Sequence, residues 1–419
     1  EIDSCQLLAL LEIKVRQTKS ILLSRWIATM RFSISRIVEI ILIVAISVFW
    51  CEYGYYYYVF YFNCYNWPGV DSSEARTNGN NLTKMMIIAD THIMGPIKSV
   101  RVDKLRREWQ MKQAFSISNS ILQPNTIIFL GDLFDEASFS YDAAFQQACK
   151  DFDRIFHFDH DRVEFIVTPG NHDVGFHNQM VNIPYLLQRF SETFMSTRSI
   201  DLSQTPKTKH LNLVLTNSMS FYNDSCHYCS QSMVETRNLE QYLQRQYSQD
   251  PQQYSSPILL GHIPLYRRND LNCSHPNSLR AKLSKQNIEG KDVLHETASR
   301  SLLTRLKPRI SISGHTHMLC HTNHHIKTDG RVDEFYEITV TSYNHKYARL
   351  TPGFLLLTAN STHVFAKHCN LIEEWVVASI YLTTVLAILL RLILLNRYNK
   401  PNDEIRLNPS ISGEEEEEG

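Results

Sequence analysis

The stretch Ile87–Gly95 reads IIADTHIMG, an apolar run that ends at Asp90 and continues to His92. A run this short that closes on polar residues is typical of a buried strand. Residues 102–122, which follow it, have helical character, so the pattern predicts the strand-helix-strand units of an α/β domain. Five apolar runs end in this way: MMIIA (85–89), TIIFL (126–130), EFIV (164–167), PILL (257–260) and RISIS (309–313).

Each of these predicted strands is followed by residues that can bind metal ions. Side chains at the carboxyl ends of neighbouring strands converge on one crevice. Carboxylate, amide and imidazole groups together suit divalent ions such as Mn, Fe or Zn, and a carboxylate can bridge two ions. The sequence therefore predicts a binuclear metal centre. The motifs are Asp90-Thr-His92, Gly131-Asp132, Gly170-Asn171-His172-Asp173, Gly261-His262 and Gly314-His315-Thr-His317.

Glycine precedes the predicted ligand in four of the five motifs. We expect these glycines to allow positive φ angles directly after a strand, so that the ligands turn inward. A Gly-Asp or Gly-His pair is common by chance, and a lone histidine is more often structural than a ligand. The prediction depends on five such motifs in this order, each after a predicted strand.

The order D-x-H, GD, GNHD, GH and GHxH resembles that of the calcineurin-like metallophosphoesterase superfamily, over Asp90 to His317. The resemblance implies a four-layer α/β sandwich, with two mixed β-sheets flanked by helices. It also implies two divalent ions, with manganese favoured and iron or zinc as alternatives. The implied roles are a first metal bound by Asp90, His92 and His317, a bridging Asp132, a second metal bound by Asn171, His262 and His315, and His172 as general acid, oriented by Asp173.

Two strongly apolar stretches, residues 37–62 and 371–395, are each near the length of about 20 residues that crosses a bilayer as a helix. A secretory signal peptide is the alternative for the first stretch, although it lies deep in the chain and lacks an obvious cleavage site. A buried core helix is the alternative for the second. The predicted order is a cytoplasmic segment 1–36, span 37–62, linker 63–81, lumenal domain 82–370, span 371–395 and cytoplasmic tail 396–419.

Flanking charges predict the orientation, because lysine and arginine gather before the first span and after the second. Both termini are then cytoplasmic, and the domain is lumenal. Four glycosylation sequons, at Asn81, Asn223, Asn272 and Asn360, lie between the spans and agree with this orientation. The 42 basic and 43 acidic residues nearly balance, so no large field of one sign indicates a nucleic-acid partner.

Nine cysteines include several that would face an oxidising lumen, where disulfides persist. The pair Cys226-His-Tyr-Cys229 has zinc-ligand spacing, but no second CxxC or histidine pair follows at finger spacing. We therefore expect a local disulfide, or no bond, rather than a metal site at this pair.

More narrowly, the motifs between two spans resemble superfamily members that remove an ethanolamine phosphate from the second mannose of glycosylphosphatidylinositol (GPI) anchors. This implies GPI-anchored proteins as substrates, cargo receptors as associates, and residence at endoplasmic reticulum exit sites, the ER-Golgi intermediate compartment and the Golgi. The acidic run Glu414–Gly419 departs from the lysine-based sorting signal of such members. Alternatives are another lumenal phosphoesterase, for nucleotides, sphingolipids or phosphoproteins, and a non-catalytic scaffold.

Overall fold

The computed structural model describes residues 34–70, 82–98, 100–194, 200–203, 208, 210–222, 224, 226–271, 273, 285–328, 330–345 and 351–398. The chain divides into two units, a helical one that contains the described residues up to Cys51 and from Trp375, and a compact one, Glu52–Glu374. Three of the predicted sequons, those at Asn81, Asn223 and Asn272, lie outside the described residues.

The first sheet of the compact unit is mixed and has the strand order β11-β10-β1-β2-β3. Strands β1, β2 and β3 run parallel, with Ile88 opposite Phe129 and Phe129 opposite Val167, so that their carboxyl ends are level. Strand β10 pairs with β1 and with β11 in antiparallel fashion. The strands are β1 Thr83–Ile88, β2 Thr126–Phe129, β3 Glu164–Val167, β10 Gly353–Ala359 and β11 Val364–Asn370.

The second sheet is also mixed, with the order β4-β5-β6-β7-β9-β8. Its four central strands β5, β6, β7 and β9 are parallel, and the outer strands β4 and β8 are antiparallel to their neighbours. The strands are β4 Ile200–Ser203, β5 Leu213–Thr216, β6 Ile258–Gly261, β7 Ile310–Ser313, β8 Cys320–Thr328 and β9 Arg331–Thr339.

The two sheets pack face to face through alternate residues of their strands, as the two-residue period of a strand requires. One buried cluster contains residues from both sheets: Met85, Ile87, Ile128, Leu355 and Leu357 from the first and Leu213, Leu260, Ile310, Ile312 and Ile338 from the second. This cluster lies directly behind the strand ends that carry the predicted ligands.

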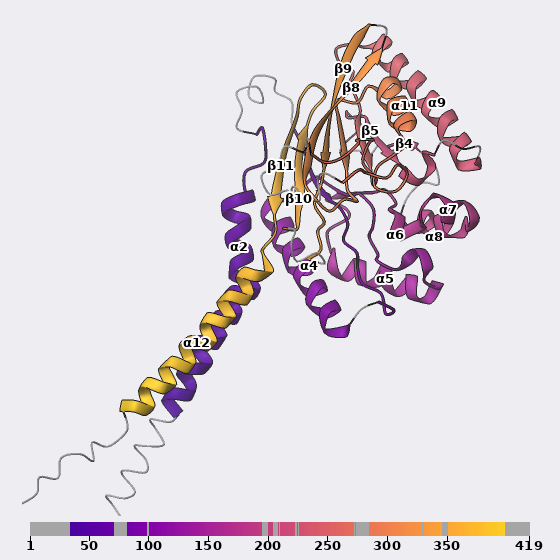
Figure 1. Cartoon of the computed structure of the whole chain (residues 1–419). Coiled ribbons are helices and arrows are strands. Elements are labelled where there is room, and N and C mark those ends of the chain that lie inside the picture. Colours follow the sequence, from indigo (N-terminus) through magenta and orange to yellow (C-terminus); the bar gives the residue numbers. More distant parts are fainter. Residues whose placement is uncertain are drawn as a thin grey trace, which may run out of the picture. The chain divides into compact units, whose positions relative to one another are not determined.

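Helices cover the outer face of each sheet, which gives the four layers (Figure 1). On the first sheet, Phe129 and Phe165 point outward and pack against Phe152 of α5, with ring centroids 5.1 and 6.1 Å apart. On the second sheet, α9 contacts β4 and α11 contacts β8. The helices are α4 Arg101–Leu122, α5 Asp142–Ile155, α9 His227–Gln249 and α11 Glu296–Leu306.

Five shorter helices lie between the strands: η3 Ala137–Phe139, α6 Asn171–Val174, α7 His177–Asn182, α8 Tyr185–Phe194 and η4 Ser218–Ser220. Three of them, α6, α7 and α8, follow β3 in succession. The predicted fold, two mixed sheets flanked by helices, is confirmed. Strand β4 pairs with β5 at the edge of the second sheet.

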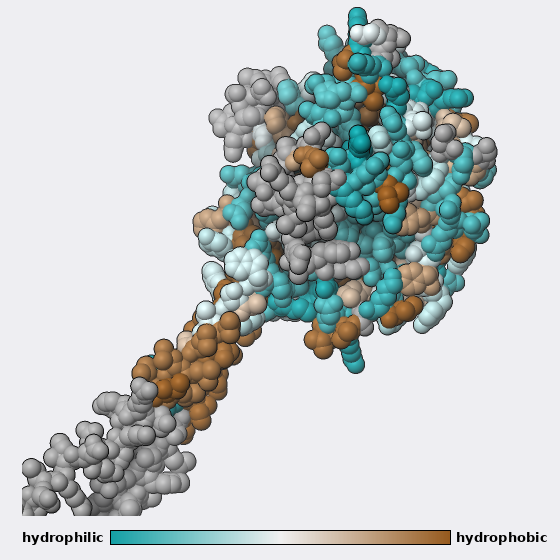
Figure 2. Space-filling view, in the orientation of Figure 1, coloured by the Kyte–Doolittle hydropathy of each residue, from teal (hydrophilic) through white to brown (hydrophobic). Residues whose placement is uncertain are grey.

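Two helices, Ile34–Cys64 and Glu374–Leu395, are long and apolar enough to cross a membrane. Figure 2 shows the apolar surface of the helical unit. Within this unit the Ser47 hydroxyl lies 2.9 Å from that of Thr384, and Arg391 pairs with Glu39. The second of these helices is part of α12, Glu374–Tyr398. Two apolar helices near the ends of the chain are compatible with a membrane protein.

The first apolar helix also contributes to the compact unit. It ends in η1 Trp50–Gly54, α2 Tyr55–Val59 and η2 Phe60–Cys64, and the side chains of Tyr56 and Phe60 are fully buried. Glu52 accepts hydrogen bonds from Arg106 and Trp109 of α4, at 2.6 and 2.8 Å. The disulfide Cys64–Cys369 joins η2 to β11, and a second disulfide joins Cys273 to Cys320.

Candidate metal centre

The five predicted motifs meet at the level carboxyl ends of the strands. Strands β1, β2 and β3 end just before Asp90, Asp132 and Asn171. Strands β6 and β7 of the other sheet end at or just before His262 and His315. The two sheets are tied at this edge, because His315 N–H donates to Asp90 Oδ2 at 2.9 Å and His262 Nδ1 lies 2.7 Å from the Leu130 carbonyl.

One group of three side chains brings Asp90, His92 and His317 together. His317 Nε2 lies 3.4 Å from Asp90 Oδ1 and 3.0 Å from His92 Nε2. Asp90 and His92 are almost wholly buried. These are the three residues to which the family resemblance assigns a first metal ion.

A second group contains Asp132, His262 and His315. His262 Nε2 lies 3.4 Å from Asp132 Oδ2, 3.2 Å from His315 Nδ1 and 3.2 Å from Asn171 Oδ1. Asn171 therefore lies with this second group, as the family resemblance implies for a ligand of the second ion.

Asp132 lies within reach of both groups. Its Oδ2 is 3.6 Å from His92 Nε2 as well as 3.4 Å from His262 Nε2. A carboxylate between two ligand sets is what a bridging role requires, so the position of Asp132 fits that role.

The donor atoms fit divalent ions in their spacing. Ions bound at about 2.0 to 2.2 Å keep neighbouring ligand atoms about 3 to 3.4 Å apart, and the contacts above fall close to that range. The tautomers also fit. His262 Nδ1 lies 2.7 Å from the Leu130 carbonyl and His315 Nε2 lies 2.6 Å from the Lys291 carbonyl, to which a ring nitrogen can only donate. When these rings are neutral, the other nitrogen of each therefore faces the group with its lone pair.

Electrostatics keep the two central carboxyl groups ionised. Burial alone would raise the pKa of Asp132, but the charges and hydrogen bonds of nearby histidines, first His262, hold it well below the usual value. His317 lowers the pKa of Asp90 in the same way against the effect of burial. Burial and the charge of Asp132 raise the pKa of Asp173 to about 7.

The backbone turns sharply at the candidate ligands themselves. Five of the candidate ligands have a positive φ, which is uncommon for residues other than glycine: Asp90, His92, Asp132, His315 and His317. Of the four glycines expected to supply positive φ, only Gly131 does so, at +79°. Gly170 is needed for a different reason, because a Cβ there would lie 2.2 Å from the Asp132 backbone nitrogen. The expectation was therefore right for Gly131 and wrong for the other three.

His172 forms a third group of possible ligands with His92 and Asp132, and its side chain is about one third exposed. Its ring stands edge-on to that of His92, with centroids 4.7 Å apart. The backbone N–H of His172 donates to Asp132 Oδ1 at 2.7 Å. The ring Nδ1 lies 3.0 Å from the Asp135 carbonyl. Asp173, which we expected to orient this ring, instead accepts backbone hydrogen bonds from Gly170, Leu133 and Phe134.

Three further residues support the site and were not predicted. Asp135 Oδ1 lies 3.2 Å from His92 Nδ1. Asn344 Nδ2 donates to the Thr91 and His92 carbonyls, and Ser342 Oγ donates to the Asp90 carbonyl at 2.8 Å. Asp135 follows the predicted ligand Asp132 by three residues, whereas Ser342 and Asn344 lie far along the chain and carry no local signal.

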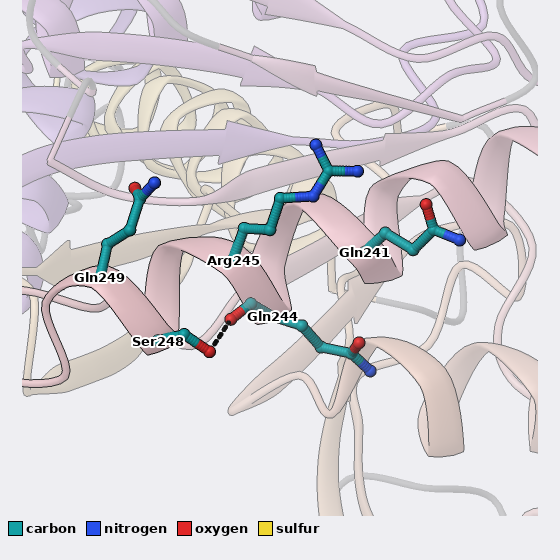
Figure 3. Close-up of a pocket in the computed structure, with 5 residues that line it drawn as sticks. All are labelled: Gln241, Gln244, Arg245, Ser248 and Gln249. Carbon is teal, nitrogen blue, oxygen red and sulfur yellow. Dashed lines mark hydrogen bonds between the residues drawn. The ribbon is translucent and has the colours of Figure 1, made fainter.

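A surface hollow over α9 is a poorer candidate for a reaction site. It is lined by Gln241, Gln244, Arg245, Ser248 and Gln249, all from one helix (Figure 3). Ser248 Oγ already donates to the Gln244 carbonyl. Exposed amides on one helix face offer no converging nucleophile or acid.

Comparison with known proteins agrees with this geometry. Residues 83–319 match the calcineurin-like phosphoesterase family. The chain belongs to this family. It is therefore a hydrolase that acts on phosphoric esters, and the family implies divalent metal ions at the centre described above.

Several curated relatives of this calcineurin-like phosphoesterase carry the name Metallophosphoesterase 1. The protein from Ailuropoda melanoleuca is 37% identical over 348 residues, which cover 80% of this chain and 83% of that protein. The Mus musculus protein is 36% identical over 353 residues, covering 81% and 84%. Among solved structures, purple acid phosphatase PPD1 from yellow lupin is 13% identical, with a TM-score of 0.44, covering 69% of this chain and 51% of that one.

Proposed function

We propose that this chain is a membrane-anchored phosphodiesterase that removes ethanolamine phosphate from the second mannose of GPI anchors. The observation that carries the proposal is the position of Asp132 between His92 of the first ligand group and His262 of the second, in a phosphoesterase with apolar helices near both ends. Relatives named Metallophosphoesterase 1 over about four fifths of the chain support the same class of reaction.

In the proposed site, Asp90, His92 and His317 would hold one divalent ion, Asn171, His262 and His315 would hold another, and Asp132 would serve both. Manganese is the proposed ion, with iron or zinc as alternatives, because oxygen and imidazole ligands accept all three. When bound, such ions would supply hydroxide near neutral pH and offset charge on the phosphoryl group.

The chain's own residues then handle the proton. His172 is the proposed general acid, because histidine exchanges a proton near pH 7 and its ring is accessible beside Asp132. Its Nδ1–H contact with the Asp135 carbonyl leaves Nε2 to hold the proton for the departing oxygen. The backbone N–H of His172 holds Asp132 in place.

Anchoring supports a lipid-linked substrate, because a substrate in the same membrane meets the enzyme at high effective concentration. The two disulfides support a lumenal domain, since such bonds persist in oxidising compartments. We propose cytoplasmic termini, residence at ER exit sites, the ER-Golgi intermediate compartment and the Golgi, and cargo receptors of the early secretory pathway as associates.

Glycosylation at Asn360 has less support than the other sequons. Its side chain is 3% exposed, and its Oδ1 accepts hydrogen bonds from the backbone of Thr362 and His363. A glycan on Asn360 would require this turn to open.

The test compares substrates on the full-length protein in lipid nanodiscs. We expect faster release of ethanolamine phosphate from a GPI bearing it on the second mannose than hydrolysis of a soluble nucleotide phosphodiester, and none from the Asp132→Asn variant. Faster nucleotide hydrolysis would favour another phosphoesterase, and no hydrolysis of either substrate would favour a scaffold. Mass spectrometry of GPI glycans from cells that lack the protein is the second measurement; unchanged glycans would overturn the proposal.

A further inference from the structure

A second cluster of ligand-type side chains lies outside the metal centre, at the amino end of α9. It consists of His177, Asp224, Cys226 and Cys229, whose ligand atoms all lie within 4.8 Å of one another. The nearest approach is between His177 Nε2 and Asp224 Oδ2, at 2.8 Å. Cys226 Sγ accepts a hydrogen bond from the Cys229 backbone at 3.0 Å, so both thiols sit on the first turn of the helix.

We propose that these four residues bind a structural zinc ion. Two thiols, one imidazole and one carboxylate form a complete tetrahedral set of the kind that zinc prefers. Such a site keeps its ligand atoms about 3.3 to 3.8 Å apart, so closing the cluster needs side-chain shifts of about 1 Å.

The histidine is prepared for this role by its surroundings. His177 Nδ1 lies 2.9 Å from the Met219 carbonyl, to which it can only donate, so Nε2, which faces Asp224, is the atom left to bind a metal ion. This contact with a backbone carbonyl is the usual outer support of a zinc-bound histidine. Tyr222 stacks on the same ring, with centroids 3.9 Å apart and planes within 10°.

The two thiols of the cluster are available to a metal ion. Both Cys226 and Cys229 are free, and Cys229 is 1% exposed. A metal ion would take the place of the thiol protons, with their release to solvent.

The sequence alone could not show this site. The Cys226-x-x-Cys229 pair lacks a second pair at finger spacing, and its partner His177 lies far upstream. His177 is brought near because α7 begins shortly after helix α6, which carries Asn171 and His172. Asp224 follows η4, where Ser218 Oγ accepts hydrogen bonds from the His262 and Ile263 backbones. A zinc ion here would brace two segments that adjoin the catalytic centre.

Elemental analysis of the full-length protein, purified with zinc and without chelator, tests the proposal independently of any phosphoesterase activity. The double variant Cys226→Ser/Cys229→Ser should contain one zinc ion fewer per chain than wild type. The control Cys149→Ser removes another free, partly buried thiol and should leave the zinc content unchanged.

Two further measurements keep the test decisive if the double variant folds poorly. A mercurial reagent that blocks thiols should release zinc from wild-type protein, and cobalt-loaded wild type should show the near-ultraviolet band of thiolate-to-cobalt charge transfer. Asp224 is half exposed, so Asp224→Asn should fold and bind zinc more weakly. Equal zinc in wild type and the double variant, or a Cys226–Cys229 disulfide in the purified protein, would overturn the proposal.

Discussion

At the scale of single residues, the metal centre depends on backbone conformations that residues other than glycine rarely adopt. Asp90, His92 and Asp132 have φ between +42° and +54°. Such conformations cost on the order of 1 to 3 kcal/mol each and persist where the surroundings enforce them. Here Asn344 and Ser342 supply that support, because they donate to the carbonyls of the Asp90–His92 turn.

The first prediction separates metal binding from proton transfer. Asp132→Asn removes the carboxylate that lies between both ligand groups, so this variant should lose metal and turnover together. His172→Gln keeps all the residues that are proposed to hold the two ions and removes the acid, so turnover should fall by about 10²- to 10⁴-fold with metal content retained. Elemental analysis and steady-state rates measure the two effects. Equal loss of metal in both variants would contradict this division of roles.

The sequence could predict most of this site at the residue scale because every candidate ligand lies within four residues of the end of a predicted strand. It could not predict Asp135 as the partner of His172, since Asp173 is the nearer neighbour in sequence. Only the fold shows that Asp173 turns away to bind the backbone of Leu133 and Phe134.

At the scale of elements, the five apolar runs correspond to β1, β2, β3, β6 and β7, and the predicted helix 102–122 is α4. The sequence analysis did not identify β8, because CHTNHHIKT lacks an apolar run. That strand pairs only with β9, at the sheet edge. Polar sequence is tolerated there because fewer of its residues are buried, so its pairing depends on the neighbouring strand more than on its own composition.

A second prediction concerns the end of α11. Lys307 is exposed at the C-cap with φ of +46°, a left-handed conformation that glycine adopts without steric cost. Lys307→Gly should therefore raise the free energy of unfolding by about 0.5 to 1 kcal/mol. Denaturant unfolding measures the change, with Lys307→Ala as the control that keeps a Cβ. If both variants gain equally, the backbone conformation is not the cause.

A third prediction concerns Glu337 of β9, which is fully buried and links three segments. It accepts hydrogen bonds from Leu265 N–H and Ser313 Oγ at 2.9 and 3.1 Å and pairs with His324 and Arg267. Burial would raise its pKa, but the hydrogen bond of His324 and the charge of Arg267 lower it below 4.5. Breaking a buried pair typically costs about 3 to 5 kcal/mol, so Glu337→Gln should be strongly destabilised at neutral pH.

The pH dependence of that difference follows from the direction of the shift. A carboxyl group with a lowered folded pKa stabilises the protein fully above its unfolded value and loses that effect as pH falls through the folded value. The gap between wild type and Glu337→Gln should therefore hold at pH 6 and narrow only below 4.5. Glu334→Gln, on the exposed part of the same strand, is the control and should change stability by less than about 1 kcal/mol.

At the scale of the whole molecule, the compact unit is closed by its first and last segments. The helix that ends at Cys64 and the strand that contains Cys369 are joined by a disulfide across a separation of 305 residues. The sequence predicted that cysteines in this region would meet an oxidising lumen, but it could not predict this pairing. The partners become neighbours only when β10 and β11 add to the edge of the first sheet.

The two disulfides give the last prediction, because they close very different lengths of chain. Cys273 and Cys320 are only 47 residues apart. Loop-closure entropy grows with the logarithm of loop length, so loss of Cys64–Cys369 should cost about 1.7 kcal/mol more than loss of Cys273–Cys320. Thermal unfolding of Cys64→Ala/Cys369→Ala and of Cys273→Ala/Cys320→Ala measures the difference, with Cys149→Ala as the control for loss of a free thiol. If the shorter crosslink proves the more important, native-state contacts around Cys273 outweigh chain entropy in this domain.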